Sequence, residues 1–471
     1  MQQVLMQPIK FGTDGWRAII AEGFTVHNLT RVSEGMANWL KATYPKPSVM
    51  IGYDCRFNGP LFNETVARVM ASNGIQVFIA QRFVSTPMVS LAVAKRQVSA
   101  GIVITASHNP PEYSGFKMKG HFGGPSLPAD IAAVEALIPD VPAVYSRSIA
   151  ELEEEGLILH FDMEALYLNH IRDSFDIDLI TKSGIKIGYD AMYGAGQRAF
   201  RKLFPNATLL HADHNPGFNG TAPEPIEKNL TEFQELIRSH GLDYGLATDG
   251  DADRIGLFDE DGNFVDSHHI ILLLIHYLHK VKGLSGKVVY TFSVTPKVDK
   301  LAKLYNLPVE CTKVGFKYIA EIMLNDDVLV GGEESGGIAI AGHVPERDGI
   351  YIGLTILEMM ARSGKKLTEL VQEIYGIVGS FNFQRRDLHL AEAEKNAIVQ
   401  RLKSQPYAQF GDYKVLRTQD LDGYKFDFAD EQWVMIRPSG TEPVLRIYAE
   451  SATRAGAEAI LDTVIATIRQ A

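Results

Sequence analysis

A serine in a short polar loop is the residue of this chain whose setting first suggests chemistry. Ser107 lies in residues 105–110 (TASHNP), directly after the apolar, β-rich run 100–104. Such a run predicts a buried strand, and the prolines that follow prevent that strand from continuing. Open α/β sheets place their catalytic groups at the carboxyl ends of strands. Ser107, with His108 beside it, is therefore a candidate nucleophile or phosphate carrier, although a lone serine in a polar turn is usually structural.

Three carboxylates alternate in a second loop. Asp249, Asp251 and Asp253 are followed by Arg254, and strand-like runs flank the loop. Three hard oxygen donors suit Mg²⁺ or Ca²⁺, and the spacing also matches positions 1, 3 and 5 of an EF-hand, with Glu260 at position 12. An EF-hand needs glycine where Arg254 stands and helices where these strands are predicted. We therefore predict a magnesium-type site, with Arg254 placed to hold a phosphate beside it.

Two further loops contain groups suited to a sugar phosphate. Glu333 and Ser335 alternate within the glycine-rich residues 331–337, so we expect them to point the same way and to bind vicinal hydroxyls. Between the last two predicted strands lies a compact set of anion-binding groups: Arg437, Ser439, Gly440 and Thr441. By itself, each loop is equally well explained as an ordinary turn.

Two basic residues lie near these loops in the sequence. Arg17 follows a glycine-flanked turn, and Lys117 comes ten residues after Ser107. Lys119 follows two residues later, and for either lysine simple solvation of the side chain is the more common case. Because a desolvated lysine beside cationic or metal groups has a lowered pKa, Lys117 is the better candidate for proton transfer.

The bulk composition limits the class of protein. The chain has 471 residues, 46% of them hydrophobic, and a formal net charge of -11, which argues against nucleic acid or an anionic membrane as the main partner. The two cysteines, Cys55 and Cys311, predict no disulfide framework and a reducing, cytoplasmic location. The N-terminus has no signal pattern, and the most apolar stretch, 270–278, is too short to span a bilayer.

Apolar β-rich runs alternate with amphipathic runs along most of the chain. Residues 49–54, 75–80 and 100–104 predict strands, and 60–72 predicts a helix. The tetrapeptide IGYD occurs at 51–54 and again at 187–190, which hints at repeated α/β units. This pattern predicts parallel α/β layers, followed from about residue 381 by a smaller α+β domain.

Together these motifs resemble those of the α-D-phosphohexomutase superfamily. The matching segments occur in the order and at the spacing of that family: 11–17 (FGTDGWR), 105–110, 249–254, 332–336 and 437–443. The resemblance implies a heart-shaped, four-domain α/β protein with three related α/β domains and a smaller C-terminal α+β domain. The corresponding boundaries are 1–150, 151–260, 261–378 and 379–471.

The resemblance also implies roles for the residues. Ser107 would carry the phosphoryl group and, with Asp249, Asp251 and Asp253, would hold Mg²⁺. The family positions proposed for acid–base work match Lys117 and His343, those lining the phosphoserine match Arg17 and His108, and those binding sugar and distal phosphate match Glu333, Ser335, Arg437, Ser439, Gly440 and Thr441. Glucose 1,6-bisphosphate would act as the priming activator, and the partner would be a hexose phosphate, in a monomer or a dimer.

The sugar loop reads Gly-Glu-Glu-Ser-Gly, which in the family is typical of phosphoglucomutases. The resemblance therefore implies interconversion of hexose 1- and 6-phosphates with glucose preferred, and phosphomannomutase or dual activity as the alternative. His343 lies eight residues after Ser335, further than in dual-specificity relatives. A Mg²⁺-dependent sugar phosphatase and a non-catalytic sugar-phosphate binder are the alternatives outside this class.

Overall fold

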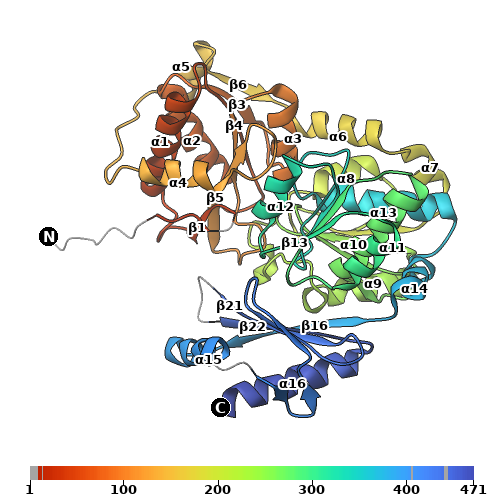
Figure 1. Ribbon diagram of the computed structural model, residues 1–471. Helices are drawn as coiled ribbons and strands as arrows, with labels where there is room; N and C mark the ends of the chain where they lie inside the picture. The colour runs from red at the N-terminus through yellow and green to blue at the C-terminus, as the bar shows by residue number, and fades with distance from the viewer. Residues whose placement is uncertain (1–8, 13, 405–406, 440–443, 471) are drawn as a thin grey trace. The chain divides into compact units, whose positions relative to one another are not determined.

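The computed structural model describes residues 9–12, 14–404, 407–439 and 444–470. These residues form two compact units (Figure 1). The first contains Met1–Val288 and Gly315–Leu370, and the second contains Val289–Val314 and Val371–Ala471. Cys55 and Cys311 are both free. Within the described residues, no helix combines the length and the apolar character that a membrane span requires.

The first sheet of the larger unit has the strand order β1-β5-β4-β2-β3-β6. Strands β4, β2, β3 and β6 run parallel, whereas β5 is antiparallel to both β4 and β1. The strands and helices of this region are β1 (Trp16–Ile19), α1 (Val26–Thr43), β2 (Ser48–Tyr53), α2 (Gly59–Ser72), β3 (Gln76–Ala80), α3 (Thr86–Arg96), β4 (Ala100–Ile104), β5 (Tyr113–Gly120), α4 (Pro128–Ala136), α5 (Ile149–Glu154) and β6 (Ile158–Phe161).

Helices α2 and α3 cover opposite faces of this sheet (Figure 1). On one face, Val66 of α2 shares a core with Ile51 of β2. On the other face, Val89 of α3 lies so close to Gly52 and Gly101 that a Cβ at Gly52 would come within 2.7 Å of it. The strands predicted at 49–54, 75–80 and 100–104 and the helix predicted at 60–72 are therefore confirmed to within one residue at each end.

The second sheet has the order β11-β10-β9-β7-β8, with a parallel part (β8, β7, β9) and an antiparallel part (β9, β10, β11). The elements of this region are α6 (Met163–Ser174), α7 (Ile177–Lys182), β7 (Ile187–Asp190), α8 (Gln197–Leu203), β8 (Thr208–Leu210), α9 (Thr231–His240), β9 (Tyr244–Thr248), β10 (Ile255–Phe258) and β11 (Phe264–Val265).

The third region contains a buried apolar helix, α10, which extends by a π-helical turn at Tyr277–Val281. Strands β14 and β15 form an antiparallel hairpin in the larger unit. The elements are α10 (Ser267–His276), β12 (Lys287–Thr291), α11 (Lys297–Leu304), β13 (Val309–Thr312), α12 (Phe316–Met323), β14 (Val328–Gly332), β15 (Ile338–Ile340), α13 (Gly349–Ser363) and α14 (Leu367–Val378).

The C-terminal sheet is antiparallel throughout, with the order β16-β22-β21-β20-β19. Its core combines apolar residues of the sheet with those of α15 and α16. The elements are β16 (Asn382–His389), α15 (Glu392–Ser404), β17 (Gln409–Phe410), β18 (Tyr413–Lys414), β19 (Arg417–Gln419), β20 (Tyr424–Asp427), β21 (Trp433–Pro438), β22 (Val444–Ser451) and α16 (Arg454–Gln470). The predicted α+β character of this region is confirmed.

Candidate active site

The loop after β4 holds Ser107 in a conformation that few non-glycine residues adopt. Ser107 is 1% exposed and has a φ of +52°. Its N–H donates to the Thr105 hydroxyl at 2.9 Å, and its carbonyl accepts from the Arg56 guanidinium at 2.7 Å. Arg56 also donates to the carbonyl of Asn109 at 2.6 Å. One buried guanidinium therefore fixes the backbone on both sides of the serine.

The Ser107 hydroxyl donates to Asp249 Oδ2 at 2.6 Å, across 142 residues of sequence. Asp249 begins the loop between β9 and β10, which pair antiparallel with Ile255 opposite Thr248. The loops make close contact: a Cβ at Gly250 would lie 2.6 Å from the Ser107 carbonyl oxygen. Strands on both sides of this loop confirm that it is not an EF-hand.

Asp249, Asp251 and Asp253 are fully buried and offer oxygen atoms that lie within 4.8 Å of one another. Burial, together with the charges of Asp251 and Asp253, raises the pKa of Asp249 well above its usual value. Burial also acts to raise the pKa of Asp251, but the Lys117 ammonium outweighs it and holds that pKa below its usual value. Such crowding of carboxylates is favourable only when cations share the site.

The donor set fits a divalent cation. Asp251 Oδ1 and Asp253 Oδ1 are buried and accept no hydrogen bond from the described residues. Unpaired buried carboxylate oxygens are costly, and bound cations commonly satisfy them. The ligand chemistry is all oxygen, which suits Mg²⁺.

Lys117 and Lys119 are buried on the same face of β5, in contrast to the expectation that either could be solvated. Lys117 Nζ lies 2.9 Å from Asp14, 2.7 Å from Asp251 and 2.9 Å from Asp253. Burial alone would lower its pKa, but these three carboxylates raise it above the usual value. The expected lowering of the Lys117 pKa is therefore wrong, because the sequence did not reveal how many carboxylates surround the amine.

Sequence reasoning missed Arg347, which lies at the centre of this cluster. Its guanidinium hydrogen-bonds Asp14, donates to Asp253 at 2.6 Å and lies 3.7 Å from Glu333. A signal was present, since Arg347 belongs to the run 342–349 that contains His343. His343 was named instead because it matches a family position proposed for acid–base work, and the resemblance gave no role to Arg347.

His343 itself contacts another set of side chains. Its Nε2 lies 3.1 Å from Asp348, its Nδ1 lies 3.0 Å from His170, and its ring stacks on Tyr351 at 4.1 Å. The side chain is 1% exposed. The structure does not bring His343 to Ser107, so the geometry does not support the predicted acid–base role. Asp348 caps the first turn of α13, and the histidine supports that cap.

A cationic group of side chains lies beside the serine. His108 Nδ1 lies 3.4 Å from Ser107 Oγ, and Arg17 donates to the Asn109 side chain at 2.7 Å. Burial, with the charges of Arg254 and Arg17, lowers the pKa of His108 well below its usual value. Guanidinium charges near a buried imidazole of lowered pKa favour an anionic ligand such as a phosphate. The structure thus brings Arg17, His108 and Arg254 together around Ser107.

The predicted sugar loop is the tight turn between β14 and β15. Glu333 is 5% exposed, and burial raises its pKa although Arg347 and Arg254 act to lower it. The turn lies against β10: a Cβ at Gly336 would come within 2.6 Å of the Ile255 carbonyl, and the Ile255 N–H donates to the Gly336 carbonyl at 3.1 Å. Side chains alternate between the two faces of a strand only as far as Gly332, where β14 ends. The argument that placed Glu333 and Ser335 on one face therefore does not apply. Ser335 is half-buried.

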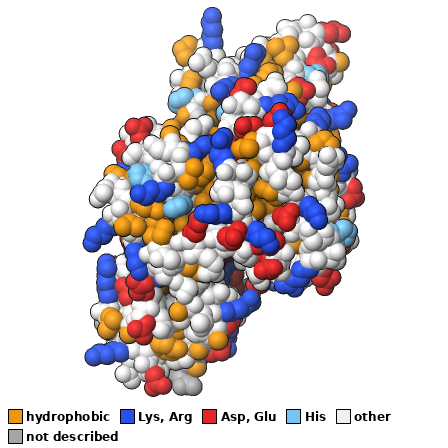
Figure 2. All heavy atoms as spheres, turned by 90° about the vertical axis from the view of Figure 1, so that its right-hand side faces the viewer, with side chains coloured by type: hydrophobic (Ala, Val, Ile, Leu, Met, Phe, Trp, Pro, Cys, Tyr) orange, Lys and Arg blue, Asp and Glu red, His pale blue; other side chains and the backbone are white. Residues whose placement is uncertain are grey.

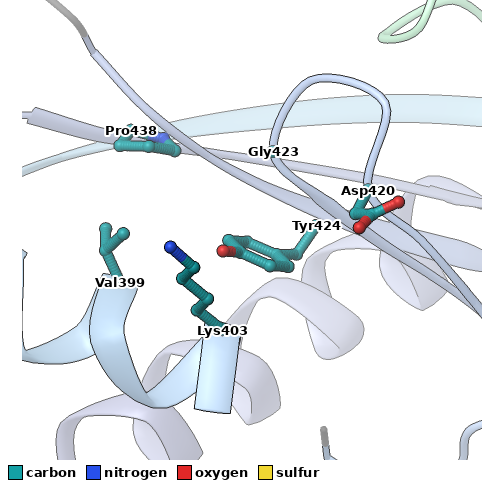
Figure 3. A pocket seen from close by; sticks show the side chains of 6 residues that line it. All are labelled: Val399, Lys403, Asp420, Gly423, Tyr424 and Pro438. Carbon is teal, nitrogen blue, oxygen red and sulfur yellow. The ribbon is translucent and has the colours of Figure 1, made fainter.

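Arg437 and Ser439 lie in the second unit, at the end of β21. Arg437 Nε is 3.2 Å from Asp422, and the Ser439 N–H donates to the Val444 carbonyl at 2.9 Å. Gly440 and Thr441 lie outside the described residues. Beside this strand end is a cavity of about 290 Å³, where Lys403 and Tyr424 point into the same space below Pro438 (Figure 3).

Family models match most of the chain. The models of the phosphoglucomutase/phosphomannomutase alpha/beta/alpha domains I, II and III match residues 8–143, 165–262 and 266–377, and that of the C-terminal domain matches 390–467.

Individual relatives align with this chain over nearly the full length of both proteins. A phosphoglucomutase/phosphomannomutase of Thermococcus kodakarensis is 31% identical, with 98% of each chain covered. A phosphoglucosamine mutase of Carboxydothermus hydrogenoformans is 29% identical, with 98% of this chain and 99% of that protein covered. The crystal structure of a putative phosphomannomutase from Thermus thermophilus superposes with a TM-score of 0.87 at 30% identity, over 98% of this chain and 99% of that one. With the serine, aspartate and arginine cluster in place, this chain belongs to the phosphoglucomutase/phosphomannomutase family of the α-D-phosphohexomutase superfamily.

Proposed function

We propose that this protein interconverts hexose 1-phosphates and hexose 6-phosphates through a phosphorylated Ser107 and a 1,6-bisphosphate intermediate. The observation that carries the proposal is the buried Ser107 hydroxyl, 2.6 Å from Asp249 and surrounded by Arg17, His108 and Arg254. Glucose 1,6-bisphosphate would prime the enzyme by phosphorylating Ser107, and the cytoplasm is the proposed location.

Asp249, Asp251, Asp253 and the Ser107 oxygen would hold Mg²⁺, which supplies positive charge beside the transferring phosphoryl group. In the forward step, the bond between phosphorus and the Ser107 oxygen breaks as phosphorus bonds to the free sugar hydroxyl, and the proton of that hydroxyl is transferred to the Ser107 oxygen. The cationic residues stabilise the negative charge on the equatorial oxygens of the transferring phosphoryl group. The bisphosphate then turns over and returns its other phosphoryl group to Ser107.

Glu333 and Ser335 are proposed to bind sugar hydroxyls, and Arg437, Ser439, Gly440 and Thr441 the phosphate that does not react. Glu333 is well suited because Arg347 and Arg254 lie nearby and orient its carboxylate. Lys117 is proposed to neutralise the aspartates.

Glucose phosphates are the proposed substrates, because the sugar loop contains two consecutive glutamates, Glu333 and Glu334. Relatives of similar identity include a phosphoglucosamine mutase, so glucosamine phosphates are a second candidate. Mannose phosphates are a third, since the Thermococcus relative is named for both activities.

The test combines intact mass with a coupled assay. The purified enzyme, primed with glucose 1,6-bisphosphate, is expected to carry about 80 Da, one phosphoryl group, that Ser107→Ala abolishes together with turnover. Ser114→Ala is the matched control: this serine is 1% exposed on β5, and its hydroxyl has no hydrogen-bond partner among the described residues. Unchanged turnover of Ser107→Ala would falsify the mutase. Net release of inorganic phosphate would favour a phosphatase, and similar kcat/KM values for glucose and mannose 1-phosphates would contradict the glucose preference.

A further inference from the structure

A second cavity in the larger unit lies outside the residues of the proposed active site. Its volume is about 450 Å³, within the range of small-molecule sites. None of the residues that line it is assigned above to metal, phosphoryl or sugar binding, although one of them, Arg56, also holds the backbone at Ser107. They come from the ends of β2 and β3 and from residues 198–216, and the ones that matter for recognition are Arg82, Arg198, Phe57, Phe83 and His214.

The cavity lies where open α/β sheets bind ligands. The chain leaves β2 toward α2 on one face of the sheet and leaves β3 toward α3 on the other face (Figure 1). Open α/β sheets place ligand sites outside the carboxyl ends of their strands, among the loops that follow them. The loops that line the cavity, 54–58 and 82–83, follow these two strands. Because β2, β3 and β4 run parallel, the cavity lies at the same edge of the sheet as the loop that carries Ser107.

The charge in this cavity is positive. Arg82 is exposed and forms no hydrogen bond or ion pair with a described residue. Arg198 lies 2.8 Å from Glu164, a carboxylate that also pairs with Lys202. The other lining charges, Arg56 and Asp54, are 3.3 Å apart and neutralise one another. The Arg82 guanidinium is thus available to bind an anion from solution.

Flat side chains also line the cavity. The rings of Phe83 and His214 are parallel within 11°, with centroids 5.9 Å apart, and the Arg198 guanidinium lies 5.0 Å from the centre of the Phe83 ring. The His214 imidazole is exposed at one end of this stack. Phe57, on the loop after β2, is 50% exposed. Exposed aromatic side chains in a cavity favour a ligand with a flat ring.

We propose that this cavity binds a small organic phosphate with a flat ring, of the nucleoside phosphate class. Arg82 would pair with the phosphate, and Phe57 and His214 would stack on the ring. The proposal does not depend on the assigned mutase reaction, because it concerns binding by residues that the reaction does not use.

The test uses AMP as the probe and equilibrium dialysis of the full chain, with saturating glucose 1-phosphate to fill the active site. We expect one AMP per chain, with adenosine and inorganic phosphate each binding at least about tenfold more weakly. Arg82→Glu is expected to weaken AMP binding at least about tenfold, and Phe57→Ala severalfold, with mutase turnover unchanged in both.

Arg172→Glu is the matched control, an exposed arginine of α6 that does not line the cavity, and it should bind AMP as the unchanged protein does. Displacement of AMP by glucose 1-phosphate would move the site to the catalytic cleft and overturn the proposal. So would full binding by Arg82→Glu, the absence of binding, or inorganic phosphate binding as tightly as AMP. A turnover assay on the same preparations separates these outcomes from failure of the mutase function.

Discussion

At the scale of single residues, the site is a network of buried opposite charges. Lys117 contacts Asp14, Asp251 and Asp253, and Arg347 contacts Asp14 and Asp253 again. Each cation therefore serves carboxylates from different parts of the chain. In such a network, removal of one member leaves its partners buried without compensation, which costs more than the pair itself contributes.

Replacement of Lys117 by Met tests this network. We expect a loss of about 3–5 kcal/mol of stability, because Asp14, Asp251 and Asp253 would remain buried with less positive charge. The midpoint of thermal unfolding, measured with and without Mg²⁺, should fall strongly and should become more dependent on the metal.

Lys182→Met is the control, since Lys182 and its partner Asp178 are exposed on α7 and such a pair contributes little to stability. Equal shifts in the two variants would contradict the network. Chelation of divalent cations is expected to abolish turnover by the unchanged enzyme while the folded state persists.

At the scale of elements, helix starts and turns position the aspartates. Thr86 opens α3, and its N–H donates to the Asp251 carbonyl at 3.0 Å while its hydroxyl donates to Asp251 Oδ2 at 2.5 Å. The loop at Gly250 meets the loop at Ser107 backbone to backbone. Elements of the first two sheets thus fix the serine and the carboxylates relative to one another.

Thr86→Val should lower kcat/KM by about tenfold, because valine preserves the shape but removes the donor that orients Asp251. Thr86→Ser keeps the hydroxyl and should recover most of the activity. The Mg²⁺ concentration for half-maximal activity, measured in the same assay, should rise in the valine variant alone. A valine variant with unchanged kinetics would show that Asp251 is oriented without Thr86.

Gly250→Ala should reduce turnover by about a hundredfold, because its Cβ would push the Ser107 loop away from Asp249. Gly376→Ala is the control: Gly376 lies in α14, where a Cβ meets nothing within 4 Å, and the change should be neutral or slightly stabilising. Turnover and thermal midpoints are measured for both. Full activity of Gly250→Ala would refute the close loop contact.

The sequence revealed the loops but only part of what surrounds them. Ser107 and the aspartates were predictable because each follows a strand whose apolar run is continuous and local. Arg347 and Thr86 were not, because their contacts with Asp253 and Asp251 join segments 94 and 165 residues apart. The alternation argument for Glu333 failed because it assumed a strand where the chain turns.

At the scale of the whole molecule, the boundaries of the two compact units differ from the four domain boundaries that the resemblance implies. Residues 289–314 group with the C-terminal part of the chain. Lys297 lies 2.8 Å from Glu431, and the Val314 N–H donates to Asp422 at 2.8 Å. The surface itself carries acidic and basic side chains interspersed over the face in Figure 2.

The buried Glu450 in this second unit makes stability depend on pH. Glu450 is 1% exposed, and burial raises its pKa to about 7, so the folded state binds its proton more tightly than the unfolded state does. Its contribution is fully present below the ordinary glutamate pKa and is lost as the pH rises through 7. Glu450→Gln should therefore gain stability relative to the unchanged protein between pH 5 and pH 8, on the order of 3 kcal/mol.

Thermal midpoints at the two pH values provide the measurement. Glu458→Gln is the control, since Glu458 pairs with Arg386 at the surface, where loss of one charge changes stability little. A difference between Glu450→Gln and the unchanged protein that is the same at pH 5 and pH 8 would contradict the assignment.

The buried lysines of β5 have a consequence for the order in which the chain is made. Lys117 pairs with Asp251 and Asp253, and Lys119 pairs with Glu346 at 2.5 Å. These carboxylates belong to segments that are synthesised more than a hundred residues later than the lysines. A nascent or truncated chain that ends before these segments would bury two ammonium groups against Asp14 alone. Such a fragment should stay loosely folded and accessible to proteases, so incomplete chains would be removed before they could hold a phosphoryl group.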